Sequence, residues 1–315
     1  MEIYLAPMEG VTGHIVRNAF AHNFGGVDKY FTPFVPTAMR MSKKIKRDLD
    51  PANNKDVRLV PQIIPNTAEE VPMMLEQMKG LGYTEVNINL GCPSGTVTSK
   101  KRGSGMLLYP DELDRMLDGI YSAADMPLSV KTRIGFHSPE EWPVILDVYK
   151  KYPMCEFIIH PRVRDEMYSG FPHLDAYALA EEAFADSPVP LCYNGDIWKL
   201  SDYHERAAMF PRTDRFMIGR GLLARPDLAA QIKGLPVPDL RAQLRAFCDE
   251  IYDGYRTIFS SEKDAVWHMK EIWANLSKSF EDSGSLVKKL LKAQTPVEYN
   301  IYLNKIFDTL DLTER

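Results

Sequence analysis

The sequence predicts a (β/α)8 (TIM) barrel followed by a small bundle of helices, and three observations predict it. Over residues 1–235, short β-rich runs alternate with amphipathic stretches, as in α/β proteins with a parallel sheet. Eight such runs fit within this length, which matches the number and size of a TIM barrel. No GxGxxG motif follows the first run, as a doubly wound dinucleotide-binding sheet would show. The pattern changes after residues 234–238, so we expect a barrel over 1–235 and a second domain over 236–315.

The strands are expected where β-branched and aromatic residues cluster between turn-forming residues. In chain order they are Ile3–Ala6, Tyr30–Phe34, Arg58–Ile64, Val86–Asn89, Leu128–Thr132, Phe157–His160, Leu191–Asn194 and Phe216–Gly219. Apolar residues at helical spacing predict the helices between them. These cover Ala68–Lys79, Asp111–Ala123, Glu140–Tyr152, Leu174–Phe184, Leu200–Met209 and the stretch around Arg40–Asp48.

The remainder of the chain reads as about four helices without a strand-like run. The expected ranges are Leu240–Phe259, Asp264–Phe280, Ser285–Lys292 and Val297–Leu310. Asp264 and Thr295-Pro296 are plausible helix starts, because Asp and Thr cap helix N-termini and Pro suits the first turn.

Composition describes an ordinary soluble protein of 315 residues, with 45% hydrophobic and 26% charged side chains. No apolar run approaches the ~20 residues that span a bilayer, so no membrane association is expected. The N-terminus leads into a strand without a signal-peptide layout, and we expect a cytoplasmic protein. The 4 cysteines lack CxxC pairing, which argues against a metal site and a disulfide framework.

The net charge of −5 disfavours a polyanionic partner, although only the local surface must be positive to bind one. Two basic clusters qualify. One comprises Arg40, Lys43, Lys44, Lys46 and Arg47, and the other comprises Lys100, Lys101 and Arg102. Each cluster is either a solvated surface or a site for nucleic acid.

A lone thiol lies just beyond the fourth expected strand, in the segment NLGCPS that contains Cys92. Gly91 and Pro93 break the strand into a turn, and the glycine-rich run Gly103–Gly105 follows. The alternative is that Cys92 is a small buried hydrophobe, as many free cysteines are. Its place at a strand end favours contact with a ligand.

Chemistry in a TIM barrel lies at the C-terminal ends of the strands, and polar residues occur at nearly every one of these ends. They include Gln62, Asn89, Lys131, Arg133, His160, Arg162, Asn194, Asp196 and Arg220. Burying so many polar groups without a ligand would be costly. Glycines beside Asn194 and Arg220 suit the loops after strands seven and eight, where this fold usually binds phosphate.

These residues stand in segments that resemble the tRNA-dihydrouridine synthases, and the segments follow the family order over about three quarters of the chain. They are LAPMEGVT (5–12), VPQ (60–62), NLGCPS (89–94), GSGMLL (103–108), VKTRIG (130–135), the stretch 160–170, NGDI (194–197) and MIGRG (217–221). The resemblance implies an FMN-dependent barrel enzyme with a C-terminal helical domain that binds tRNA.

The resemblance also implies roles for individual residues. Those that would hold FMN are Pro7, Met8, Gln62, Lys131, His160, Asn194, Gly195, Asp196, Gly219 and Arg220. Cys92 would give a proton to C5 of a uracil ring whose C6 receives hydride from the flavin. Residues that would contact the uridine or the RNA backbone are Asn89, Lys100, Lys101, Arg102, Arg133, Arg162 and Arg164.

NADPH is the reductant that the resemblance implies, with NADH an open alternative, because no nucleotide fingerprint is visible. Two other functions stay open: a flavin-dependent reductase of a small enone or free pyrimidine, and a non-catalytic RNA-binding protein. The basic loop and the helical domain favour tRNA over a small substrate. The sequence leaves open which uridine is modified and the oligomeric state, and it predicts no obligate protein partner.

Overall fold

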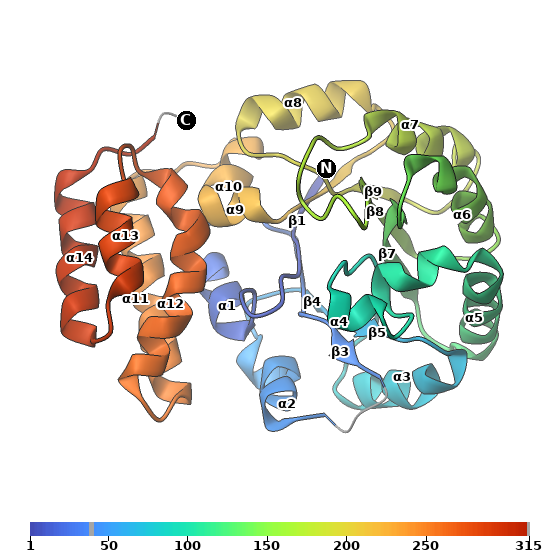
Figure 1. Cartoon of the computed structure of the whole chain (residues 1–315), viewed down its shortest axis with the longest axis horizontal. Helices are drawn as coiled ribbons and strands as arrows, with labels where there is room; N and C mark the ends of the chain where they lie inside the picture. Colours follow the sequence, from blue (N-terminus) through green and yellow to red (C-terminus); the bar gives the residue numbers. More distant parts are fainter. Residues whose placement is uncertain (38–40, 314–315) are drawn as a thin grey trace.

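Parallel strands form the centre of the molecule, and helices form an outer ring around them (Figure 1). The computed structural model describes residues 1–37 and 41–313. The strand segments are β1 (Glu2–Leu5), β2 (Lys29–Phe31), β3 (Val35–Pro36), β4 (Leu59–Val60), β5 (Gln62–Ile64), β6 (Val86–Leu90), β7 (Leu128–Gly135), β8 (Glu156–Val163), β9 (Leu191–Tyr193) and β10 (Arg215–Ile218).

Two of the barrel strands are interrupted, and this explains how ten segments make an eight-stranded barrel. β2 pairs with β4 and β3 pairs with β5, so residues 29–36 and 59–64 each serve as one strand of the barrel. Pro61, which has no N–H to donate, separates β4 from β5. Because β1 pairs with both β10 and β2, the parallel sheet closes on itself within the described residues. The predicted TIM barrel is confirmed.

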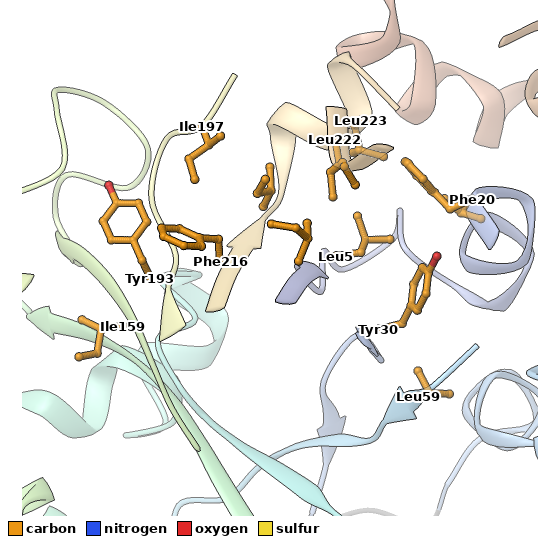
Figure 2. Packing of buried hydrophobic residues seen from close by; sticks show 14 of the residues in the cluster. Leu5, Phe20, Tyr30, Leu59, Ile159, Tyr193, Ile197, Phe216, Leu222 and Leu223 are labelled. Atoms are coloured by element: carbon orange, nitrogen blue, oxygen red, sulfur yellow. The ribbon is translucent and has the colours of Figure 1, made fainter. Parts of the chain in front are cut away.

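The barrel is filled and covered by alternating side chains. Tyr4, Phe31 and Met217 belong to a buried cluster inside the barrel. Their neighbours Leu5, Tyr30 and Phe216 point the other way and pack under the surrounding helices, as Figure 2 shows. Because successive side chains of a strand point to opposite faces, each strand fills the barrel interior with one set of side chains and packs against the helices with the other.

The outer helices follow the strands in chain order. They are α1 (His14–Asn23), α2 (Lys43–Leu49), α3 (Val71–Gly80), α4 (Gly95–Thr98), α5 (Pro110–Ala123), α6 (Trp142–Tyr149), α7 (Leu174–Ala183), α8 (Leu200–Met209), α9 (Arg220–Ala224) and α10 (Leu228–Ile232). The sequence did not predict α1, whose N-cap residue Gly13 offers no capping side chain. Arg40 of the first basic cluster lies outside the described residues.

Four C-terminal helices stand beside the barrel at α1 (Figure 1): α11 (Leu240–Ile258), α12 (Glu262–Leu276), α13 (Gly284–Lys292) and α14 (Pro296–Thr309). The Phe20 ring of α1 packs edge-on against Phe247 of α11 at 4.9 Å between centroids. The expected helix start at Asp264 is wrong, since the Ser261 side chain caps α12 by accepting from the Lys263 N–H. The expected start at Thr295 is confirmed, because Thr295 accepts from the Glu298 N–H.

No helix among residues 1–37 and 41–313 is long and apolar enough to cross a membrane.

Candidate functional site

A cavity of about 590 Å³ lies at the C-terminal ends of the barrel strands, a size suited to a small ligand or cofactor. Every residue that the sequence assigned to a cofactor lines it, together with Cys92, Asn89 and Arg133. The other residues predicted for the site do not line it: Lys100, Lys101, Arg102, Arg162 and Arg164.

Cys92 sits in a loop that is fixed from both sides through its backbone. The Asn89 side-chain oxygen accepts hydrogen bonds from the N–H groups of Gly91 at 3.0 Å and Cys92 at 2.9 Å. The hydroxyl of Ser104, at the start of the glycine-rich segment, donates to the Cys92 carbonyl oxygen at 2.8 Å. These bonds fix the backbone around Cys92 and so place its thiol at the cavity wall.

A chain of amide hydrogen bonds supports Asn89 from inside the barrel. Asn89 Nδ2 donates to Gln62 Oε1 at 2.7 Å, and Gln62 Nε2 donates to Asn87 Oδ1 at 2.8 Å. Asn87 Nδ2 then donates to the Ser129 hydroxyl oxygen at 3.0 Å. All four side chains are buried, so each amide has its orientation set by its neighbours. The chain links β5, β6 and β7 directly beneath the cysteine loop.

Cations dominate the wall formed by β7 and β8. Burial and the nearby Arg133 guanidinium lower the pKa of the Lys131 ammonium to about 8. Among the described residues, Lys131 has no hydrogen bond or ion pair, although it faces the cavity. Burial, with Arg133 and Lys131 close by, lowers the pKa of His160 well below its ordinary value, so its imidazole is neutral near pH 7. This wall favours an anionic or electron-rich ligand.

The thiol itself stays protonated at neutral pH. Burial raises the pKa of Cys92 above its ordinary value, and the cations Arg133 and Lys131 offset only part of that effect. Because the thiolate and not the thiol is the nucleophile, a half-buried cysteine with a raised pKa is better suited to give a proton than to attack.

Two buried arginines hold the loop that follows β8. Arg133 donates to the carbonyl oxygens of Val163 at 2.9 Å and Met167 at 2.7 Å. Arg162 donates to the carbonyl oxygens of Ser169 at 3.1 Å and Gly170 at 2.8 Å. These bonds fix the segment 163–170, which carries Tyr168 to the edge of the cavity.

The loops after β9 and β10 meet at Asp196. Its carboxylate accepts from Arg162 at 2.6 Å and from Arg220 at 2.8 Å. Gly221 is required for their close approach, since a Cβ there would lie 1.9 Å from the Ile197 carbonyl oxygen. Arg220 also lies over the rings of Tyr168 at 4.9 Å and Trp198 at 5.1 Å. One cationic group is thereby presented between two aromatic rings at the cavity rim.

The predicted RNA residues outside the cavity have partners of their own, with one exception. Lys101 pairs with Glu112 at 2.9 Å, and Arg102 pairs with Glu70 at 2.9 Å. Arg164 donates to the Pro93 carbonyl oxygen at 3.1 Å, on the cysteine loop. Lys100 is exposed and its ammonium has no partner among the described residues.

Several aromatic and acidic residues of the cavity were not predicted for the site: Glu9, Phe34, Tyr168 and Trp198. Glu9 and Tyr168 lie within segments already singled out in the sequence, so their position was an available signal. Phe34 ends an expected strand. No comparable signal marks Trp198, whose ring also receives the Lys278 ammonium of the C-terminal helices at 4.1 Å.

Within the described ranges, no group of three or more His, Cys, Asp or Glu side chains could hold a metal ion. The wall of the cavity offers amides, cations, backbone groups and aromatic rings to a ligand.

A family model described as dihydrouridine synthase (Dus) matches residues 4–310. The tRNA-dihydrouridine(16) synthase of Pseudomonas putida is 29% identical over 250 residues, which cover 74% of this chain and 73% of that protein. The protein of the same name from Neisseria meningitidis serogroup A is 24% identical over 316 residues, covering 96% of this chain and 93% of that one.

Solved structures share the fold at low sequence identity. 2-Naphthoyl-CoA reductase has a TM-score of 0.54 and 13% identity, covering 75% of this chain and 50% of that chain. Morphinone reductase has a TM-score of 0.50 and 10% identity, covering 77% of this chain and 88% of that chain. At such identities the likeness concerns the fold alone.

Proposed function

The chain belongs to the dihydrouridine synthase family, and on that premise we propose that it reduces the C5=C6 bond of a uridine in tRNA to 5,6-dihydrouridine. FMN is the proposed cofactor and NADPH the proposed reductant. The relatives described above are named for position 16 of tRNA, and we propose that position as the substrate uridine.

The chemistry of the cavity wall fits a flavin mononucleotide. The unpaired Lys131 ammonium offers a cation to an electron-rich ring, and Arg220 with the adjoining glycine loops offers donors to a phosphate. Gln62, locked by Asn87 and Asn89, is held in one orientation for the polar edge of that ring. Pro7, Met8, His160, Asn194, Gly195, Asp196 and Gly219 complete the proposed cofactor wall.

Bound and reduced FMN would supply a hydride to C6 of the uracil ring. Cys92 would give its thiol proton to C5, which completes the addition of two hydrogens across the double bond. Its raised pKa keeps that proton in place at neutral pH. The thiolate that remains would take a proton from water before the next turnover. Arg133 lies at the same wall, where its hydrogen bonds to the carbonyl oxygens of Gly91, Val163 and Met167 would hold the loops around the uracil in place.

RNA would approach the cavity at its rim, beside the cysteine loop. Lys100 has a free ammonium beside the cysteine loop, and we propose it as a contact to the RNA backbone. Lys101, Arg102, Arg162 and Arg164 would support that contact by fixing the loops, since each is engaged with protein groups. We propose residues 236–315 as the tRNA-binding domain and the cytoplasm as the location.

The single observation that carries the proposal is that the Cys92 thiol and the unpaired Lys131 ammonium lie on the walls of one cavity in a chain of this family. It is tested by incubating the purified protein with NADPH and unmodified tRNA, and by measuring dihydrouridine with nucleoside mass spectrometry. Product with the wild type and almost none with Cys92→Ala is expected.

The same assay distinguishes the main alternative, a flavin reductase of a small enone or free pyrimidine. A yellow, NADPH-reducible protein that consumes such a compound and leaves native tRNA from a deletion strain unmodified would overturn the proposal.

A further inference from the structure

A second cavity of about 540 Å³ adjoins the first and shares Glu9, Pro33 and Phe34 with it. Its far walls come from α2 and from the junction of α11 and α12, which approach one another beside α1 (Figure 1). The barrel and the C-terminal helices therefore line a second cavity that borders the one containing Cys92. Neither the proposed reaction nor the cofactor described above uses this space.

Aromatic rings line the second cavity. The rings of Phe259 and His268 lie parallel, 6° apart in plane and 4.4 Å between centroids. Phe34, at the junction of the two cavities, is half-buried and has no ring partner among the described residues. Flat apolar faces of this kind accept a nucleobase regardless of its identity.

Unpaired cations line the same cavity. Lys44 and Arg47 of α2 have no ion pair or side-chain hydrogen bond within residues 1–37 and 41–313. The Arg47 Nε atom is buried without a partner. The Asp48 carboxylate forms no ion pair with Lys44 or Arg47, because it pairs with Arg17 and His14. The half-buried Arg47 and the exposed Lys44 therefore offer two positive charges to an anion, and the Glu9 carboxylate lines the cavity at its border with the first one.

We propose that the second cavity binds the nucleotide next to the target uridine, with its base against Phe34, Phe259 and His268 and its phosphate against Lys44 and Arg47. This inference rests on the proposed function and extends it to a second nucleotide. The wall shared with the catalytic cavity puts the flanking nucleotide of the same RNA strand within reach of the second cavity.

The other candidate occupant is the adenosine part of the nicotinamide donor, which has similar chemistry. The KM for tRNA and the KM for NADPH distinguish a bound nucleotide of the RNA from the adenosine part of the nicotinamide donor. Lys44→Gln combined with Arg47→Gln is expected to raise the KM for tRNA about tenfold and to leave the KM for NADPH, measured by flavin reduction, unchanged. Phe259→Leu, which keeps apolar bulk and removes the ring, is expected to raise the KM for tRNA about fivefold.

Lys46→Gln is the matched control, because Lys46 lies on the same helix but outside both cavities. Its KM for tRNA should stay within twofold of the wild type. Cross-linking provides a readout independent of activity: 4-thiouridine placed next to the target should attach to the peptides around residues 44–47 or 255–268.

Three results would overturn the proposal. An unchanged KM for tRNA with no cross-link in these peptides would remove the subsite while the wild type still forms dihydrouridine. A raised KM for NADPH alone would assign the cavity to the nicotinamide donor. A wild type that makes no dihydrouridine would remove the proposed function itself and the subsite with it.

Discussion

The side-chain oxygen of Asn89 accepts a hydrogen bond from the backbone N–H of Cys92 at 2.9 Å, while its amide nitrogen donates to Gln62 at 2.7 Å. The cysteine loop is thus joined to the floor of the barrel through one buried amide. The position of the thiol depends on a hydrogen-bond chain inside the barrel, and this makes Asn89 a positioning residue.

Asn89→Ala should reduce the rate of dihydrouridine formation by roughly 10- to 100-fold, because a small displacement of a catalytic group is costly. It should also lower the free energy of unfolding by about 1–3 kcal/mol, since it leaves buried polar groups unpaired. Single-turnover kinetics and chemical denaturation measure the two effects. Asn18→Ala, which removes an α1 amide outside the cavity, is the control. Equal rates in the two variants would contradict the role of Asn89.

Cys92→Ala should retain its flavin and oxidise NADPH with oxygen as acceptor, yet form dihydrouridine at least ~100-fold more slowly, as expected for loss of a general acid. Cys155→Ala, which changes a half-buried cysteine away from the cavity, should behave as the wild type. Parallel assays of NADPH consumption and modified nucleoside distinguish the two. A Cys92→Ala variant as active as the wild type would remove the thiol as the acid.

The pH dependence follows from the direction of the Cys92 pKa shift. Because burial raises that pKa, the thiol keeps its proton at neutral pH and loses it only above its ordinary range. Alkylation of Cys92 by iodoacetamide should therefore be slow from pH 7 to 8.5 and accelerate at higher pH, where the thiol loses its proton. Rapid alkylation at pH 6, which requires thiolate, would contradict the protonated thiol.

Much of this site was accessible from the sequence, because TIM-barrel chemistry gathers at strand ends and the eight strands carry clear β-rich runs. The hydrogen bonds and ion pairs that join residues far apart in the chain could not be predicted from the sequence. Arg133 and Arg162 were singled out for the uridine or the RNA backbone, but nothing in the sequence indicates their hydrogen bonds to backbone carbonyl groups of residues 163–170. Arg102 forms an ion pair with Glu70, 32 residues away, which no local sequence pattern predicts.

The lengths of two strands also could not be predicted from the sequence. β7 continues to Gly135 and β8 to Val163, beyond the predicted ends, although their last residues include arginines. Charged residues normally signal the end of a strand, but here tertiary hydrogen bonds make their burial possible. Helix α1 escaped prediction for a related reason, since Arg17 on it is buried through contact with Asp48, 31 residues away.

Lys131→Met should stabilise the flavin-free protein and weaken flavin binding. The pKa of Lys131 is lowered to about 8, so the folded state binds fewer protons than the unfolded state between about pH 8 and the ordinary lysine value. The penalty of the buried charge is thus complete below pH 8 and fades as the pH rises. We expect a gain of about 1–2 kcal/mol at pH 7, discounted because the Lys131 side chain is only partly buried. At pH 10 the gain should be smaller. Chemical denaturation at both pH values tests this, and equal stability of variant and wild type at pH 7 would contradict it.

Arg220→Ala should lower the affinity for FMN by about tenfold or more, because it removes a charge-assisted donor proposed for the phosphate. Flavin retained after gel filtration, read from its visible absorbance, measures the effect. Riboflavin, which lacks the phosphate, serves as the matched ligand and should lose little affinity. A variant that loses both ligands equally would assign Arg220 to packing against Tyr168 and Trp198 instead.

Gly103→Ala should disturb Cys92 directly. Gly103 has a φ of +55°, and a Cβ there would lie 2.8 Å from the Cys92 carbonyl oxygen and 2.9 Å from the Cys92 Cβ. The substitution therefore adds a steric clash to the backbone strain, and we expect a loss of about 2–4 kcal/mol in the free energy of unfolding together with slower dihydrouridine formation. Gly82→Ala separates the two contributions, because Gly82 has a φ of +87° with no atom within 4 Å of the added Cβ. That control should lose only about 1 kcal/mol, the cost of the backbone conformation, and keep full activity. If both variants lost equal stability and Gly103→Ala kept the wild-type rate, the tight packing of the glycine-rich segment against Cys92 would have no role in placing the thiol.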